Sequence, residues 1–148
     1  MTRLLFALLA LALCAPAFAA DWQLITKNKE GAVFIDARGI VVAKDGTRKA
    51  WDKWEYAEEQ AGFPDSGIKT FASSRHLAHY NCKDRTFAVG EVIYLDAKGK
   101  SVGQITLDVN PAAFSDVPPE SISEAQLDFV CKAKVRNTPA PAPTTGTQ

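Results

Sequence analysis

His76, His79 and Cys82 have the spacing His-x-x-His-x-x-Cys, and their side chains could together bind a metal ion. Zn²⁺ prefers imidazole nitrogen and thiolate sulfur, and a tetrahedral site needs all of its ligands to converge on one point. The surrounding residues are typical of a β-strand, in which successive side chains point to opposite faces. His76 and Cys82 would face one way and His79 the other. We therefore expect no metal site and interpret the two histidines as ordinary strand residues, with a haem contact through one of them left open.

Cys82 has a second chemistry available, a disulfide bond with Cys131. The third cysteine, Cys14, lies in an N-terminal segment that we expect to be removed. Export would leave one cysteine pair and deliver it to a compartment in which thiols are oxidised. The alternative is two free reactive thiols.

Residues 1–19 have the three parts of a secretory signal peptide: a positive start, an apolar run over 4–14 and small residues before the expected cleavage site. The apolar run is about half as long as the ~20 residues of a transmembrane helix. Leu11 to Cys14 resembles a lipoprotein signal, but Leu13 stands where that motif requires a small residue. We expect an exported chain without a stable membrane span, in the periplasm, with display on the outer surface as the alternative.

Sequence motifs of the common enzyme classes are absent. The chain contains no G-x-S-x-G, H-E-x-x-H, G-x-G-x-x-G or P-loop pattern. Its 17 basic and 17 acidic residues balance, so it has no field of one sign to attract nucleic acid. We expect a chain that is not an enzyme, holds no cofactor and does not bind nucleic acid.

Most of the chain from residue 20 to 136 has the residue pattern of β-strands joined by short turns. The expected strands cover about 22–25, 32–36, 40–43, 48–56, 71–82, 86–95 and 102–109. Consecutive strands with short connections predict an antiparallel meander. The segment 58–67 should be a loop, because it holds two glycines and a proline.

The last element has apolar residues at the spacing of a helix instead of the alternation of a strand. Ser121 and Glu124 have the spacing of a capping box, and apolar residues then recur at helical spacing up to about residue 134. These apolar residues are Ile122, Ala125, Leu127, Phe129, Val130, Cys131 and Ala133. The sequence thus predicts an α+β domain over 20–136, with one C-terminal helix packed on a sheet.

The final stretch 137–148, NTPAPAPTTGTQ, should be a disordered, solvated tail, or alternatively a spacer or a peptide ligand.

Trp51 is the first candidate for contact with a protein partner. In a strand over 48–56, alternation places Trp51 on one face and both Trp54 and Tyr56 on the other face, which we expect to turn toward the core. Exposed tryptophan is favoured in protein interfaces, whereas packing beneath a loop is the alternative. The expected loop adds three further contact candidates, Glu58, Glu59 and Phe63.

Several short motifs together resemble one known family. They are Trp22, Val33 to Asp36, Trp51 with Tyr56 and Gln60, Tyr80 to Arg85, Tyr94 to Gly99 and Val130-Cys131. Over about 22–132 the chain resembles the surface-adhesin protein E family of Gram-negative bacteria. That resemblance implies a single antiparallel sheet of about six strands, with a C-terminal helix tethered through a disulfide that matches Cys82 to Cys131. The named member of that family is an outer-membrane lipoprotein that binds host matrix and plasma proteins, and also haem, so the resemblance implies an adhesin-like envelope protein.

Two functions follow as expectations. The first is an adhesin-like envelope protein that engages another protein, for instance a host matrix protein, through its sheet face or loops. The alternative is a periplasmic inhibitor of a secreted hydrolase such as lysozyme, which is basic and would need acidic residues such as Glu58 and Glu59. An exposed sheet edge would also allow a homodimer.

Overall fold

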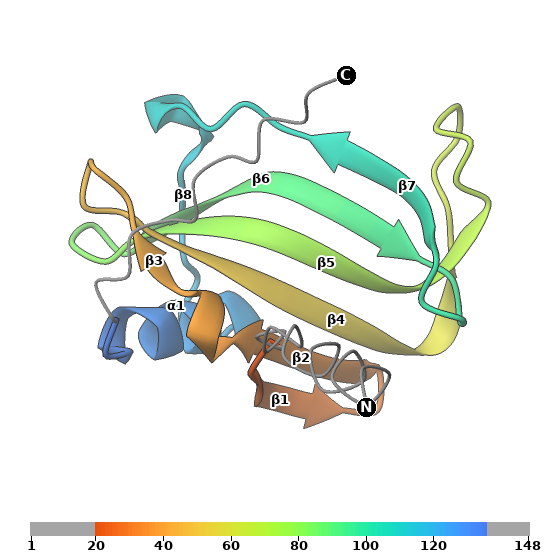
Figure 1. The fold of residues 1–148 in the computed structure, drawn as a ribbon, viewed down its shortest axis with the longest axis horizontal. Coiled ribbons are helices and arrows are strands. Elements are labelled where there is room, and N and C mark those ends of the chain that lie inside the picture. The colour runs from red at the N-terminus through yellow and green to blue at the C-terminus, as the bar shows by residue number, and fades with distance from the viewer. Residues whose placement is uncertain (1–19, 136–148) are drawn as a thin grey trace, which may run out of the picture.

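The computed structural model describes residues 20–135, so the expected signal peptide and the 137–148 tail lie outside the described residues. One antiparallel sheet forms the centre of the molecule (Figure 1). Six strands follow one another across it: β1 (Trp22–Asn28), β2 (Gly31–Asp36), β4 (Arg48–Ala61), β5 (Thr70–Asn81), β6 (Thr86–Leu95) and β7 (Ser101–Thr106). This confirms the predicted α+β meander.

Two further strands raise the strand count to eight rather than six. β3 (Val41–Val42) pairs with the start of β4, and β8 (Ser115–Asp116) pairs with the start of β6. Each has only two residues. β3 falls within the strand expected at 40–43, whereas β8 consists of serine and aspartate and has no alternating apolar pattern that would mark a strand in sequence. Two short 3₁₀ turns, Ala37–Gly39 and Pro111–Ala113, complete the connections.

The expected loop at 58–67 begins later than predicted, because β4 continues to Ala61. The pairing of β4 with β5 runs to Glu55, which lies opposite Ser73, and resumes at Gln60, which lies opposite Phe71, with a register shift between the two pairs. This bulge bends the long strand and leaves Glu58 and Glu59 exposed on a strand instead of in a loop. The chain then turns over residues 62–69. Gly62 is required there, since a Cβ atom would lie only 1.7 Å from the carbonyl oxygen of Ile68.

The C-terminal helix α1 (Ile122–Lys132) packs on one face of the sheet, which we call the inner face. Its buried residues are Gln126, Leu127 and Val130, whereas Ala125 is exposed, so the buried stripe is shifted from the predicted one. The main core joins this stripe to Ile35, Ile40, Ala50, Ala78 and Tyr80. A second cluster at the far end of the sheet contains Ile68, Phe71, Val92 and Tyr94.

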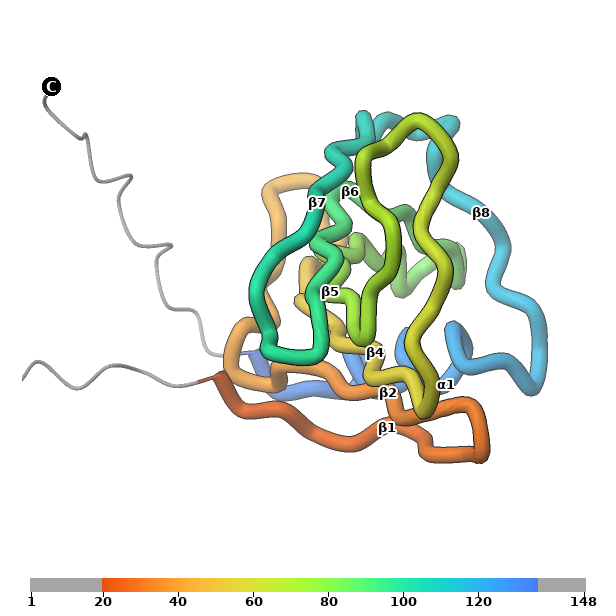
Figure 2. Tube along the Cα trace, turned by 90° about the vertical axis from the view of Figure 1, so that its right-hand side faces the viewer, coloured from red at the N-terminus to blue at the C-terminus, as the bar shows by residue number. Residues whose placement is uncertain are grey.

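Side chains that alternate with these core residues point to the opposite side, which we call the outer face. Trp51, Lys53, Arg75 and Leu77 lie there, between the buried positions Ala50, Asp52, Ser74 and Ala78. Figure 2 shows how the sheet curves from β1 at one edge to β7 at the other, with α1 on one side only. Within residues 20–135, the inner face is therefore covered by α1, and no α-helix lies on the outer face.

Candidate partner-binding surface

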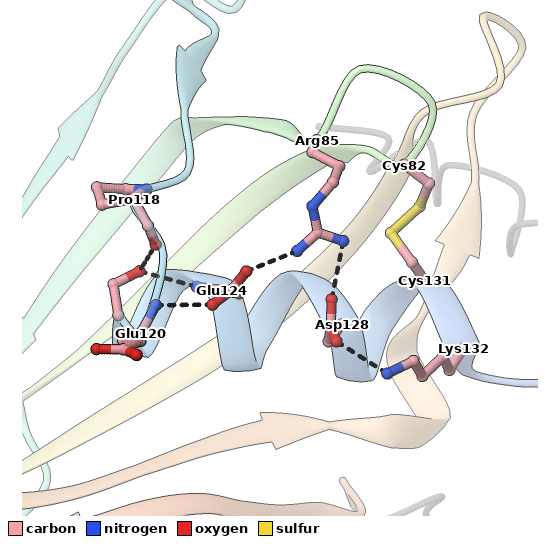
Figure 3. A network of polar contacts seen from close by, with 9 residues as sticks. Cys82, Arg85, Pro118, Glu120, Glu124, Asp128, Cys131 and Lys132 are labelled. Atoms are coloured by element: carbon pink, nitrogen blue, oxygen red, sulfur yellow. Dashed lines mark hydrogen bonds and ion pairs between the residues drawn. A yellow bond between two sulfur atoms is a disulfide. The ribbon is translucent and has the colours of Figure 1, made fainter.

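A disulfide bond joins the helix to the sheet. The Cys82 and Cys131 sulfurs are 2.05 Å apart and their Cα atoms 5.7 Å apart, which confirms the expected link between them. Arg85, in the same turn as Cys82, donates hydrogen bonds to Asp128 at 3.0 Å and to Glu124 at 3.1 Å (Figure 3). Hydrogen bonds from Lys132 and Arg85 lower the pKa of Asp128. The β5–β6 turn therefore holds α1 through one covalent bond and one group of ion pairs.

The start of the helix is capped much as its sequence indicated. The Ser121 hydroxyl accepts a hydrogen bond from the Glu124 backbone N–H at 3.1 Å. The Glu124 carboxylate reaches back to the N–H of Glu120 at 2.8 Å, one residue earlier than a standard capping box. At the other end, Arg48 of β4 donates to the carbonyl oxygens of Val130 and Ala133 at 2.7 and 2.8 Å. Both ends of α1 are thus satisfied, and the second is fixed by the sheet.

A buried polar group lies between the helix and the sheet. Asp52 is 3% exposed, and one of its carboxylate oxygens accepts a hydrogen bond from the Gln126 side chain at 3.1 Å. Nδ1 of His76 lies 2.8 Å from the other oxygen, although this contact does not have the alignment of a hydrogen bond. The partially shielded His76 ring packs 6.0 Å from the Trp54 ring. His76 therefore belongs to the helix interface.

We expect Gln126→Leu to lower the free energy of unfolding by about 2 kcal/mol, because it removes the donor to a buried carboxylate. Urea unfolding of the purified domain measures this loss. Gln104→Leu is the matched control, since Gln104 makes an exposed hydrogen bond to Glu91. Equal, small losses for the two variants would show that the Asp52 contact contributes nothing to helix packing.

His79 lies on the outer face, as strand alternation predicted, while His76 points inward and Cys82 is held in the disulfide. Burial, with a smaller contribution from the Lys49 ammonium, lowers the pKa of His79 below its ordinary value. Its imidazole is therefore neutral at pH 7. Within residues 20–135, no group of three or more His, Cys, Asp or Glu side chains is placed to hold a metal ion.

Aromatic and cationic side chains gather on the outer face over β1, β2, β4 and β5. The Lys53 ammonium lies 4.4 Å from the centre of the Phe34 ring and 5.3 Å from that of Trp22. The Arg75 guanidinium lies 5.9 Å from the Trp22 ring. Such cation–π contacts hold both the rings and the cations in place. Lys53 also forms an ion pair with Glu55 at 2.6 Å.

Trp51 belongs to the same face, two residues before Lys53 and opposite Leu77 in register. It is partly buried by its neighbours and not fully exposed. Strand alternation identified Trp51 and could have identified Lys53 too. Trp22 and Phe34 were missed as site residues, because only the register of β1, β2 and β4 places them beside Lys53. We call the set Trp22, Phe34, Trp51, Lys53 and Arg75 the outer-face patch.

The structure does not bring the other contact candidates beside Trp51. Phe63 is 43% exposed in the β4–β5 connection, and its ring packs on Phe71 and Tyr94, which line the inner side of the sheet. Glu58 and Glu59 lie near the same end of β4, and Glu59 accepts a hydrogen bond from Thr70. Figure 1 shows this connection at the end of the sheet farthest from α1. Two separate surfaces therefore replace the single expected contact region.

The fold and the disulfide agree with one known family. The model for surface-adhesin protein E matches residues 22–132. The chain belongs to the surface-adhesin protein E family. This match spans β1 through α1 and both cysteines, so the covalently held helix lies inside the family region.

Membership of the surface-adhesin protein E family supports an adhesin-like surface protein with a protein as its partner, and it is consistent with an exported envelope protein. The comparisons with curated proteins and with solved structures found no match. In the part of the chain that the structure describes, no helix is long and apolar enough to cross a membrane.

Proposed function

We propose that this chain is a non-enzymatic, exported envelope protein that binds a protein partner through its outer-face patch. The observation that carries the proposal is the row of aromatic and cationic side chains on a sheet face that α1 leaves uncovered. Tryptophan and arginine are the residues most enriched in binding hot spots. Residues 1–19 would serve as the signal peptide that exports the chain.

Four side chains of the outer-face patch already contact one another in the free domain. Trp22, Phe34, Lys53 and Arg75 come from paired strands, and their mutual contacts restrict their rotamers. A pre-ordered patch loses little side-chain entropy on binding, which favours affinity. A partner with carboxylates would meet Lys53 and Arg75, and its apolar groups would meet the indole of Trp51. Host matrix proteins are the partners to test first.

Trp51→Ala should weaken binding to the partner by about 30-fold, since a hot-spot tryptophan contributes about 2 kcal/mol. The measurement is binding of the purified domain, residues 20–148, to immobilised host matrix proteins. Trp54→Phe is the control, because Trp54 lies on the inner face beside His76. Circular dichroism of both variants checks that the sheet is intact. Binding that survives Trp51→Ala in a folded variant would move the contact away from the outer face.

The alternative function, inhibition of a secreted hydrolase, depends on a different part of the molecule. Glu58 and Glu59 are exposed and lie at the end of β4, away from Trp51. Two carboxylates at this position could meet a basic enzyme such as lysozyme. A lysozyme inhibition assay with the same purified domain belongs beside the binding assay. Inhibition lost in the charge variant Glu58→Gln/Glu59→Gln would favour this alternative.

A further inference from the structure

A large open groove lies at one end of the outer face, apart from the outer-face patch. It has a volume of about 1330 Å³. One wall is the β3–β4 hairpin with Val41 and Val42, and the other is the segment that contains Val109, Pro111 and Phe114. Val41 and Val42 are 41% and 51% exposed, so apolar surface faces solvent along this wall. Apolar surface of this kind commonly marks a binding site.

The floor of the groove is polar, and two lysine and two aspartate side chains lie among its lining residues. Lys49 of β4 and His79 of β5 lie opposite each other in register, and Asn81 follows on the same face. Lys44 adds a second ammonium from the hairpin, while Asp45 and Asp84 lie among the lining residues as well. The Asp45 carboxylate is already engaged by the backbone and hydroxyl of Thr47, at 3.0 and 2.7 Å.

The end of the described chain enters this groove. Arg48 binds the carbonyl oxygens of Val130 and Ala133, which directs the chain after α1 around the end of the sheet. Val135 then packs against the main core and also lines the groove. Thirteen residues, Arg136 to Gln148, follow from that point. In a polyproline conformation they would span about 40 Å, enough to cross the groove from wall to wall.

We propose that the C-terminal segment 136–148 of this chain binds in the groove. Its Pro-Ala-Pro-Ala-Pro run is preset for an extended conformation and is a good match to a groove with an aromatic residue, Phe114. The terminal carboxylate would meet Lys44 or Lys49. Since the segment starts at the groove itself, its effective concentration is in the millimolar range, so a weak intrinsic affinity is sufficient. The proposal does not depend on the function assigned to the outer-face patch.

The test compares ¹⁵N NMR spectra of the domain 20–148 and of the same domain ending at Val135. We expect the amide signals of Lys44, Lys49 and Asn81 to shift on truncation and that of Arg75 to stay. The peptide RNTPAPAPTTGTQ, added at millimolar concentration to the truncated domain, should restore the original positions. The same peptide with glycine for each proline should bind at least fivefold more weakly, since it is not preset for the extended form.

Unchanged groove signals after truncation would overturn the proposal and would leave 136–148 as the solvated tail that its composition suggests. Should the truncated domain fail to fold, Val42→Glu in the full-length domain provides the test. Val42 is half exposed, so the change spares the core and places a negative charge in the groove wall. Shifts at Asn81 and in the segment's own Ala and Thr signals support binding, and shifts limited to the neighbours of Val42 contradict it.

Discussion

Replacing Cys82 and Cys131 together by alanine is expected to lower the free energy of unfolding by about 4 kcal/mol. The bond closes a loop with a sequence separation of 49 residues, and the chain-entropy estimate for a loop of this length gives about that value. Small domains are stable by only about 5–15 kcal/mol, so the loss is a large fraction of the total. Urea unfolding of the oxidised domain and of the double variant measures it directly.

The ion pairs beside the disulfide provide the control for this prediction. Arg85→Ala removes the exposed contacts to Glu124 and Asp128, and exposed pairs contribute about 0–1 kcal/mol each. We therefore expect a loss well below that of the double cysteine variant. If the two variants lose the same free energy, the covalent bond is not what holds α1 on the sheet.

Leu127→Ala should destabilise the domain by about 3 kcal/mol, within the range for buried leucine in protein cores. Leu127 is 1% exposed and packs from α1 into the main core of the inner face. The matched control is Leu24→Ala on β1, because Leu24 is 55% exposed and should lose less than about 1 kcal/mol. Thermal or urea unfolding of both variants gives the comparison. Similar losses at the two leucines would show that the helix is not an integral part of the core.

The sequence was sufficient for the parts of the fold that depend on local pattern. Period-2 alternation found the long strands, including the bounds of β6 at Thr86 and Leu95, and Ser121 marked the start of α1. The bounds of β4 were wrong, because Glu58, Glu59 and the following Gly and Pro suggest a loop, while pairing with β5 keeps the chain extended to Ala61. Tertiary pairing overrides local propensity at such positions.

The candidate site was only partly predictable, since it is assembled across strands. Trp51 was found because alternation within one strand places it on the face opposite to that of Trp54. Trp22 and Phe34 join Lys53 only through the register of three strands, which no local pattern specifies. Burial of Gln126 against Asp52 was missed for a related reason. A polar residue in a helix is expected to face solvent, and its buried partner lies 74 positions away in the sequence.

A photo-crosslinking experiment tests most directly the claim that the outer face recognises a partner and the helix side does not. Benzoylphenylalanine would replace Arg75, which is exposed beside Trp22 on the outer face, and in a second variant Ala125, which is exposed on α1. Irradiation of the two purified variants with a bound matrix protein should give a covalent adduct from position 75 and none from position 125. An adduct from position 125 alone would contradict the account.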